Sequence, residues 1–143
     1  MDERKASGPM KALIYAALAA SLLATQGLAS AQQSQRELIA VAAASHDLSS
    51  PVSGRPGQSP LFLLFDMQGR FIEAVDNPHK NDKGNAGIPT VDFLGSKGVK
   101  VIVAASLGAR IVEVMQSKGI QPMEFAGSVG DAVKRAVKLM KKN

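Results

Sequence analysis

Val99-Lys100-Val101-Ile102-Val103-Ala104 is the stretch that decides the fold of this 143-residue chain. It is a run of mostly β-branched residues, followed by Ser106-Leu107-Gly108 and by a segment with apolar residues at helical spacing, residues 111–119. This pattern predicts a buried strand, a tight turn and a helix, which form half of a β-α-β unit. A strand without polar alternation is typical of a parallel sheet that is covered on both faces. The carboxyl end of such a strand is where α/β sheets usually bind their ligands.

The rest of the chain supplies strands and helices on both sides of this stretch. Residues 47–60 are rich in Ser, Gly and Pro and are expected to be irregular. Gly69 is predicted at the positive-φ position of a hairpin turn, and Ser128 begins the last helix in a capping-box pattern. The predicted elements are a strand at 38–44, hairpin strands at 61–66 and 70–75, a helix at 87–97, the strand and helix at 99–119, a strand at 120–125 and a helix from 128 onward.

This order predicts an α/β fold of the ribonuclease H-like type, a three-layer sandwich around a mixed five-stranded sheet. The antiparallel hairpin forms one half of the sheet, and the parallel β-α-β-α segment forms the other. Because crossovers between parallel strands are right-handed, helices should cover the sheet faces and the first strand should lie beside strand 99–104. Pro122 cannot donate a hydrogen bond to a ladder, so the last strand is expected at a sheet edge.

The first 31 residues have the pattern of a secretory signal peptide. Lys11 precedes an apolar segment, residues 12–24, and Leu28-Ala29-Ser30-Ala31 supplies the small residues of a cleavage site after Ala31. The apolar segment is shorter than the about 20 residues that a membrane span needs, although an uncleaved anchor is the alternative. We therefore expect export, to the periplasm, with only transient membrane contact through the signal peptide. Residues 32–37 are then a flexible leader, and residues 38–143 form a single domain.

The composition of the exported part limits its chemistry. The chain contains no cysteine, so neither disulfides nor thiolate metal ligands are available. From residue 32 onward 14 Lys and Arg oppose 10 Asp and Glu, and five of these basic residues lie among the last ten positions. A basic tail can meet nucleic acid or anionic lipid, but export and the helical spacing favour a solvated helix face. No nucleic-acid partner is expected.

Six short motifs share their order and spacing with a known family. They are Ser45-His46-Asp47-Leu48-Ser49-Ser50-Pro51-Val52, Gly54-Arg55, Leu61-Phe62-Leu63-Leu64-Phe65-Asp66, Asn77-Pro78, Gly84-Asn85-Ala86-Gly87-Ile88 and Ala105-Ser106-Leu107-Gly108. Together they resemble the dinitrogenase iron-molybdenum cofactor-binding family over Leu38 to about Lys141. That family comprises small domains that carry nitrogenase cofactor or its precursors, together with related stand-alone proteins, and it has the ribonuclease H-like fold.

The resemblance implies a protein that binds a metal cluster or a small anion. The ligand would be an iron-sulfur or molybdenum-type cluster, or a molybdate-like oxyanion. Two departures separate this chain from the family's cofactor carriers. The carriers work in the cytoplasm, whereas the signal-peptide pattern predicts export, and Ala44-Ser45-His46 lacks the ligating cysteine that some carriers have near the first strand. We therefore do not expect delivery of nitrogenase cofactor.

Both histidines of the chain are candidate metal ligands. His46 follows the first strand at its carboxyl end, where an imidazole can bind a metal or donate a hydrogen bond to an oxyanion. Its other interpretation is a loop histidine that hydrogen-bonds local backbone. His79 lies in a polar loop that could close over the same site, and a solvent-exposed side chain is the alternative there.

Two glycine-containing segments each lead into a predicted helix, namely Gly84-Asn85-Ala86-Gly87 and Ser106-Leu107-Gly108. The free N–H groups and the dipole at a helix start bind anions, and glycine lets a ligand approach the backbone. Ordinary turn chemistry is the alternative for these glycines, and a surface salt bridge is the alternative for Arg55 and Arg110, which could add positive charge. The predicted cofactor-binding residues are His46, Arg55, Gly84, Asn85, Gly87, Ser106, Leu107 and Gly108.

The sequence does not predict an enzyme. A ribonuclease H-like nuclease needs carboxylates that converge on metal ions, including one within the first strand, and residues 38–43 contain none. The nucleophile and zinc-protease motifs Gly-x-Ser-x-Gly and His-Glu-x-x-His are also absent. The leading hypothesis is an exported binding protein that holds a metal cluster or metal oxyanion. The alternative is an interaction module whose basic last helix docks a periplasmic partner or an anionic membrane.

Overall fold

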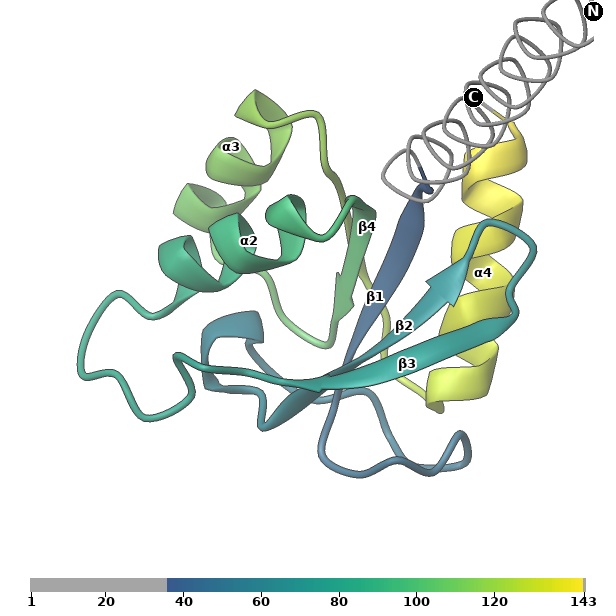
Figure 1. Cartoon of the computed structure of the whole chain (residues 1–143), viewed down its shortest axis with the longest axis horizontal. Helices are drawn as coiled ribbons and strands as arrows, with labels where there is room; N and C mark the ends of the chain where they lie inside the picture. The colour runs from purple at the N-terminus through teal and green to yellow at the C-terminus, as the bar shows by residue number, and fades with distance from the viewer. Residues whose placement is uncertain (1–35, 143) are drawn as a thin grey trace, which may run out of the picture. The chain divides into compact units, whose positions relative to one another are not determined.

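The computed structural model describes residues 36–142, which form one five-stranded sheet with helices on both faces (Figure 1). Its strand order is β3-β2-β1-β4-β5. The elements are β1 (Leu38–Ala43), η1 (Pro56–Gln58), β2 (Leu61–Asp66), β3 (Phe71–Asp76), α2 (Gly87–Ser96), β4 (Val99–Ala104), α3 (Ala109–Ser117), β5 (Gln121–Glu124) and α4 (Val129–Lys141).

The sheet is half antiparallel and half parallel, as the order of elements predicted. β1 pairs antiparallel with β2, and β2 pairs antiparallel with β3. On its other side β1 pairs parallel with β4, which pairs parallel with β5 at the edge. The predicted α/β architecture, a mixed five-stranded sheet with the first strand beside strand 99–104, is therefore confirmed. Pro122 does lie in the edge strand β5.

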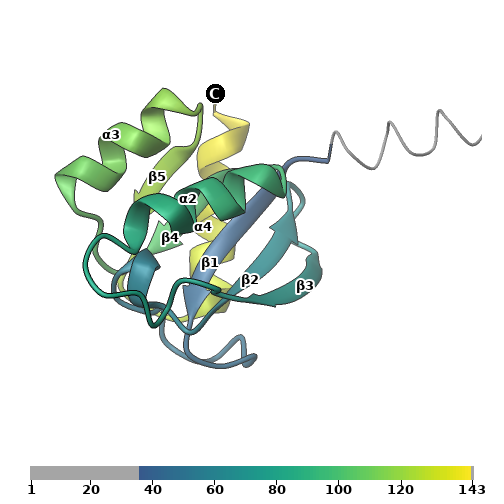
Figure 2. The same ribbon diagram turned by 60° about the vertical axis from the view of Figure 1, so that its left-hand side comes forward.

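Strand β1 separates two hydrophobic cores. All six of its residues are buried, and alternate side chains point to opposite faces of the sheet. Ile39 and Val41 belong to the core under α4, whereas Ala40 and Ala42 belong to the core under α2 and α3. Figures 1 and 2 show α4 alone on one face, with α2 and α3 together on the other. The result is three layers with the sheet in the middle.

The hairpin between β2 and β3 is closed by the carboxylate of Asp66. Its Oδ1 accepts hydrogen bonds from the backbone N–H groups of Gln68 (3.0 Å) and Arg70 (2.9 Å), and its Oδ2 accepts one from Arg70 Nε at 2.7 Å. Gly69 has a φ of 86°, so its predicted role in the turn is confirmed. Burial raises the pKa of Asp66, but the bonds from Arg70 and Gln68 outweigh this effect and the pKa is lowered overall.

We predict that Asp66 makes the stability of the protein depend on acid. Because its pKa is lower in the folded state, its stabilising contribution is present above the unfolded value of about 3.9 and is lost as the pH falls through the folded value. The difference in free energy of unfolding between wild type and Asp66→Asn should therefore be largest near neutral pH and shrink below about pH 4. Urea unfolding over this pH range measures it, with the exposed Glu73→Gln as the control. A difference that stays constant with pH would contradict the assignment.

The ends of most elements lie within one or two residues of the predicted ones. The short helix η1 was not predicted, since residues 47–60 were expected to be irregular. Within that segment Val52 and Pro51 form isolated bridges to Ala43 and Ser128. Ser128 caps α4 as predicted, because its side chain accepts a hydrogen bond from the N–H of Asp131.

The predicted signal peptide and most of the leader lie outside the described residues, so cleavage and export stay predictions. Among residues 36–142 no helix is both long and apolar enough to span a bilayer.

Candidate functional site

A pocket of about 330 Å³ lies where β4 ends and α2, α3 and η1 begin. Six of the eight predicted cofactor-binding residues line it, namely Arg55, Gly84, Asn85, Gly87, Ser106 and Gly108. They come from three separate segments of the sequence. The structure therefore brings the two glycine-containing helix starts together at the carboxyl end of a parallel strand, where they were expected to meet.

Two helix starts in this pocket have no side-chain cap. The N-cap residue of α2 is Ala86 and that of α3 is Gly108, and neither can offer a side-chain oxygen to the first N–H groups of its helix. Both helices are at least nine residues long, so each has a developed dipole with its positive end at this pocket. Such ends favour an anion that accepts hydrogen bonds from backbone N–H groups.

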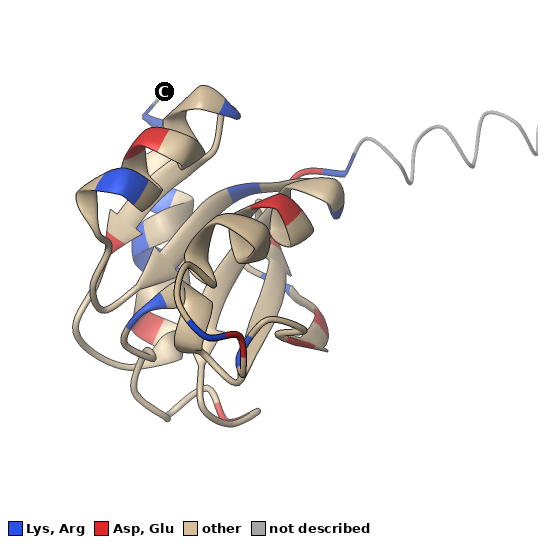
Figure 3. Ribbon diagram, turned by 90° about the vertical axis from the view of Figure 1, so that its left-hand side faces the viewer, with Lys and Arg blue, Asp and Glu red and all other residues tan. Residues whose placement is uncertain are grey.

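The charged side chains that line the pocket are both basic. Arg55 precedes η1 directly, and Arg110 lies in the first turn of α3. No Asp or Glu of the described chain is among the lining residues. Elsewhere on this side of the molecule acidic and basic positions are interspersed (Figure 3). The positive character of the pocket is therefore local, and it adds to that of the helix ends.

The first strand reaches the pocket by an indirect route. After β1 the chain turns toward α4, where the carbonyls of Leu48 and Ser50 accept hydrogen bonds from Gly130 and Val129 (both 2.9 Å). It then crosses the end of the sheet, and Ser53 and Gly54 accept bonds from the N–H groups of Ala105 (2.9 Å) and Ser106 (3.1 Å). These bonds place Arg55 beside the loop that leads into α3.

A buried amide side chain holds η1 against α2. Asn77 is 1% exposed, and its Nδ2 donates to the carbonyls of Pro56, Gly57 and Ser59 at 3.0–3.2 Å. Its Oδ1 accepts hydrogen bonds from the hydroxyl of buried Thr90, in α2, at 3.2 Å and from the N–H of His79 at 3.0 Å. The amide thus joins three segments that have no ladder between them. This arrangement, which we call the Asn77 clasp, sets the wall of the pocket that carries Arg55.

The wall also requires close approach of two backbones. A Cβ on Gly57 would lie 2.6 Å from the amide nitrogen of Gly87 and 2.9 Å from the carbonyl carbon of Ala86. A Cβ on Gly87 would lie 3.0 Å from Ile111 Cγ1 and closer still to its Cδ1. Glycine at these two positions therefore lets η1, α2 and α3 meet around the pocket.

Two of the predicted cofactor-binding residues, His46 and Leu107, do not line the pocket. Leu107 is buried, and its N–H already donates to Glu124 Oε1 at 2.9 Å. His46 is exposed in the segment that turns toward α4 and is not among the lining residues, so the expected meeting of His46 with Ser106-Leu107-Gly108 is not found. The reason is the excursion of residues 44–50, which the sequence pattern does not show.

His79 is engaged within its own loop. Its Nδ1 lies 2.8 Å from Asp82 Oδ2, and its side chain is 31% exposed. It is not among the residues that line the pocket. In the described part of the chain no three His, Asp or Glu side chains are grouped to hold a metal ion. The structure therefore does not bring the two predicted metal ligands together, and their ligation stays a prediction.

Sequence reasoning missed the Asn77 clasp and the part of the wall formed by Pro56-Gly57-Gln58. In the sequence, Pro56-Gly57 indicates only a break within an irregular segment. Asn77-Pro78 indicates only a loop, because the side-chain partners of Asn77 in η1 and α2 lie 13–21 residues away. A Pro at the first position of a helical turn was the signal that could have indicated η1.

We predict that Gly57→Ala disrupts the pocket wall. The added methyl group would meet backbone atoms, which cannot rotate away, so η1 and α2 must separate at a cost of about 1–3 kcal/mol. Gly54→Ala is the matched control, because a Cβ there meets nothing within 4 Å. Urea unfolding gives the loss of stability, and NMR shifts of the Ala86 and Gly87 amides report the separation. Equal stability of the two variants would show that the close approach is not a constraint.

Known proteins with similar sequences and structures support this fold and show the family of the chain. The sequence profile described as "Dinitrogenase iron-molybdenum cofactor" matches residues 37–139. No curated protein matches the chain. One similar solved structure is the apo form of the orange protein from Desulfovibrio gigas, at 28% identity and a TM-score of 0.64, covering 73% of this chain and 88% of that one. Another is a putative NifB protein from Thermotoga, at 27% identity and a TM-score of 0.55, covering 74% and 88%.

Proposed function

Because this chain belongs to the dinitrogenase iron-molybdenum cofactor family, we propose that it is an exported, non-enzymatic protein that holds an anionic metal cluster or a metal oxyanion in this pocket. Membership of this family supports an accessory role in which a cofactor is bound. Location in the periplasm rests on the signal-peptide pattern of residues 1–31. The metal-containing anion is the cargo in this proposal.

The single observation that carries the proposal is the convergence of two uncapped helix starts and two arginines in one pocket. Backbone N–H groups and guanidinium groups donate hydrogen bonds, and the guanidinium groups also carry positive charge, but neither kind of group coordinates metal ions. Oxygen or sulfur atoms at the surface of an anion can accept these hydrogen bonds. The donor set therefore fits an intact anion that is bound through its outer atoms.

The size of the pocket suits a small cluster as well as a single oxyanion. Its volume of about 330 Å³ is well above the roughly 10–15 Å³, on the same measure, that a single water molecule needs. Because His46 and His79 lie outside it, the proposal assigns them no role in holding the anion. Binding should then persist when either imidazole is removed.

The proposal predicts that Arg55 and Arg110 dominate anion affinity. A hydrogen bond to a charged group contributes about 1.5–3 kcal/mol, and 1.4 kcal/mol corresponds to a factor of ten in affinity. Each Arg→Gln change should therefore weaken binding about tenfold, and the double variant about a hundredfold. Equilibrium dialysis with molybdate and with tetrathiomolybdate, followed by metal analysis, measures this. Arg135→Gln, which removes an exposed arginine from α4, is the control.

A second variant separates loss of binding from loss of folding. Gly108→Asp puts a carboxylate at the N-cap of α3, where it stabilises the helix by a few tenths of a kcal/mol, roughly, while it competes for the N–H groups offered to the anion. Gly108 has a φ of −69°, and a Cβ there meets nothing within 4 Å, so the fold accepts the change. We expect a more stable protein that no longer retains the anion. Ser117→Asp, at the other end of α3, should retain it.

Other results would reject this site. If His46→Ala abolishes retention while the arginine variants and Gly108→Asp bind normally, the anion lies elsewhere. If wild type retains neither molybdate, tetrathiomolybdate nor an anaerobically prepared iron-sulfur-molybdenum cluster, the proposed class of ligand is wrong.

A further inference from the structure

A second hollow lies on the opposite face of the sheet, between α4 and the turn of the β2–β3 hairpin. It is a groove of about 450 Å³, and its floor is apolar. Phe65 comes from β2, Val133 and Val137 come from α4, and Gly69 sits at the hairpin turn. A Cβ at Gly69 would lie 3.4 Å from both valines, so the absence of a side chain there keeps the groove open. This groove has no part in the anion pocket.

Exposed apolar side chains continue the floor of the groove. Leu48 and Phe71 are the exposed large hydrophobic residues of the described chain, at 48% and 54%. Leu48 lines the groove, and the ring of Phe71 packs edge-on against that of Phe65, with 5.8 Å between centroids. Scattered single apolar residues are normal on a protein surface, but a contiguous apolar patch marks an interaction site. Here both exposed residues adjoin the same groove.

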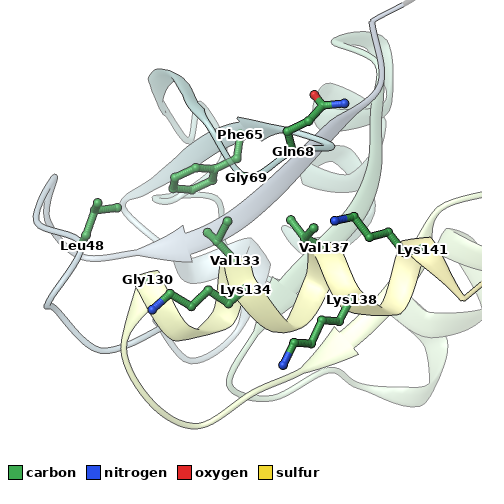
Figure 4. Close-up of a pocket in the computed structure, with 10 residues that line it drawn as sticks. All are labelled: Leu48, Phe65, Gln68, Gly69, Gly130, Val133, Lys134, Val137, Lys138 and Lys141. Carbon is green, nitrogen blue, oxygen red and sulfur yellow. The ribbon is translucent and has the colours of Figure 1, made fainter.

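A row of lysines runs along the groove beside the valines. Lys134, Lys138 and Lys141 line it, and their spacing of four and three residues puts them on one side of α4. Figure 4 shows Val133 and Val137 pointing from α4 toward the sheet, while Lys134 and Lys138 extend from the side of the helix. No Asp or Glu is among the groove residues of the described chain. An apolar row and a basic row therefore lie in parallel along the helix.

We propose that this groove docks an amphipathic α-helix of a partner protein, with an acidic row beside its apolar row. An apolar stripe repeating every three or four residues fits a concave apolar floor, and carboxylates next to it meet the lysines. A membrane surface is flat and engages apolar groups that protrude, so a hollow with its apolar floor recessed between two elements favours a rod-shaped occupant. The basic residues near the carboxyl end of the chain then have a specific task, which is to set the orientation of the partner helix.

A charge-swap experiment tests this proposal. The probe is a synthetic peptide of about 20 residues, long enough to be helical, with leucine at every third or fourth position and glutamate at the positions that follow. Fluorescence anisotropy of the labelled peptide measures its binding to this protein, purified after expression of the full chain. Lys134→Glu/Lys138→Glu should weaken binding about tenfold or more, because two attractive contacts become repulsive. A peptide with lysine in place of glutamate should bind this variant better than wild type.

Matched variants identify the contributions of charge and apolar contact. Arg135→Glu makes the charge change of one of these two substitutions on an exposed residue of α4 outside the groove, and it should leave affinity within about twofold. Leu48→Ser, at a half-exposed position, should weaken binding of the glutamate peptide without loss of the fold, which thermal unfolding checks.

Three outcomes would overturn the proposal. The first is no binding of the glutamate peptide by wild type at millimolar concentration. The second is an equal loss with Arg135→Glu, which would indicate general attraction to a basic helix. The third is tighter binding to phosphatidylglycerol vesicles than to the peptide, abolished by the same lysine changes, which would assign the groove to a membrane.

Discussion

Strand β1 has no face exposed to water, and both halves of the molecule depend on this burial. It is the only described strand that pairs antiparallel on one side and parallel on the other, so the hairpin and the β-α-β-α segment are joined through it. Its alternate side chains enter the two hydrophobic cores. A polar residue at any of its six positions would lie in one core without a hydrogen-bond partner, which is unfavourable at either face.

The shape of the pocket beside α2 and α3 depends on the path that the chain takes after this buried strand. After β1 the chain does not enter a helix; it first passes the N-terminal end of α4 and then returns across the end of the sheet. Its return is fixed by hydrogen bonds to the loop before α3 and by the Asn77 clasp. The helix starts of α2 and α3 are thereby held beside Arg55 without capping side chains. The hydrogen-bond donors of the pocket are thus positioned in advance of any ligand.

The two proposed surfaces lie on different layers and use different physical chemistry. The pocket near α2 and α3 offers hydrogen-bond donors and positive charge, whereas the groove beside α4 offers an apolar floor with basic residues along it. Because the sheet separates them, a substitution in one surface does not directly contact residues of the other. An accessory protein that holds a cargo and also meets a partner needs two such independent surfaces.

The sequence by itself determined the elements and their pairing, since unbroken β-branched runs specify buried strands and Pro and Gly positions specify ends and turns. It also indicated most of the pocket, because Gly84-Asn85-Ala86-Gly87 and Ser106-Leu107-Gly108 mark helix starts that a parallel sheet must bring together. Only the tertiary structure decided that His46 lies away from them, that Glu124 occupies the N–H of Leu107, and that Asn77 binds η1 and Thr90. These are contacts between residues far apart in the chain, and they depend on the path of a loop that no local periodicity specifies.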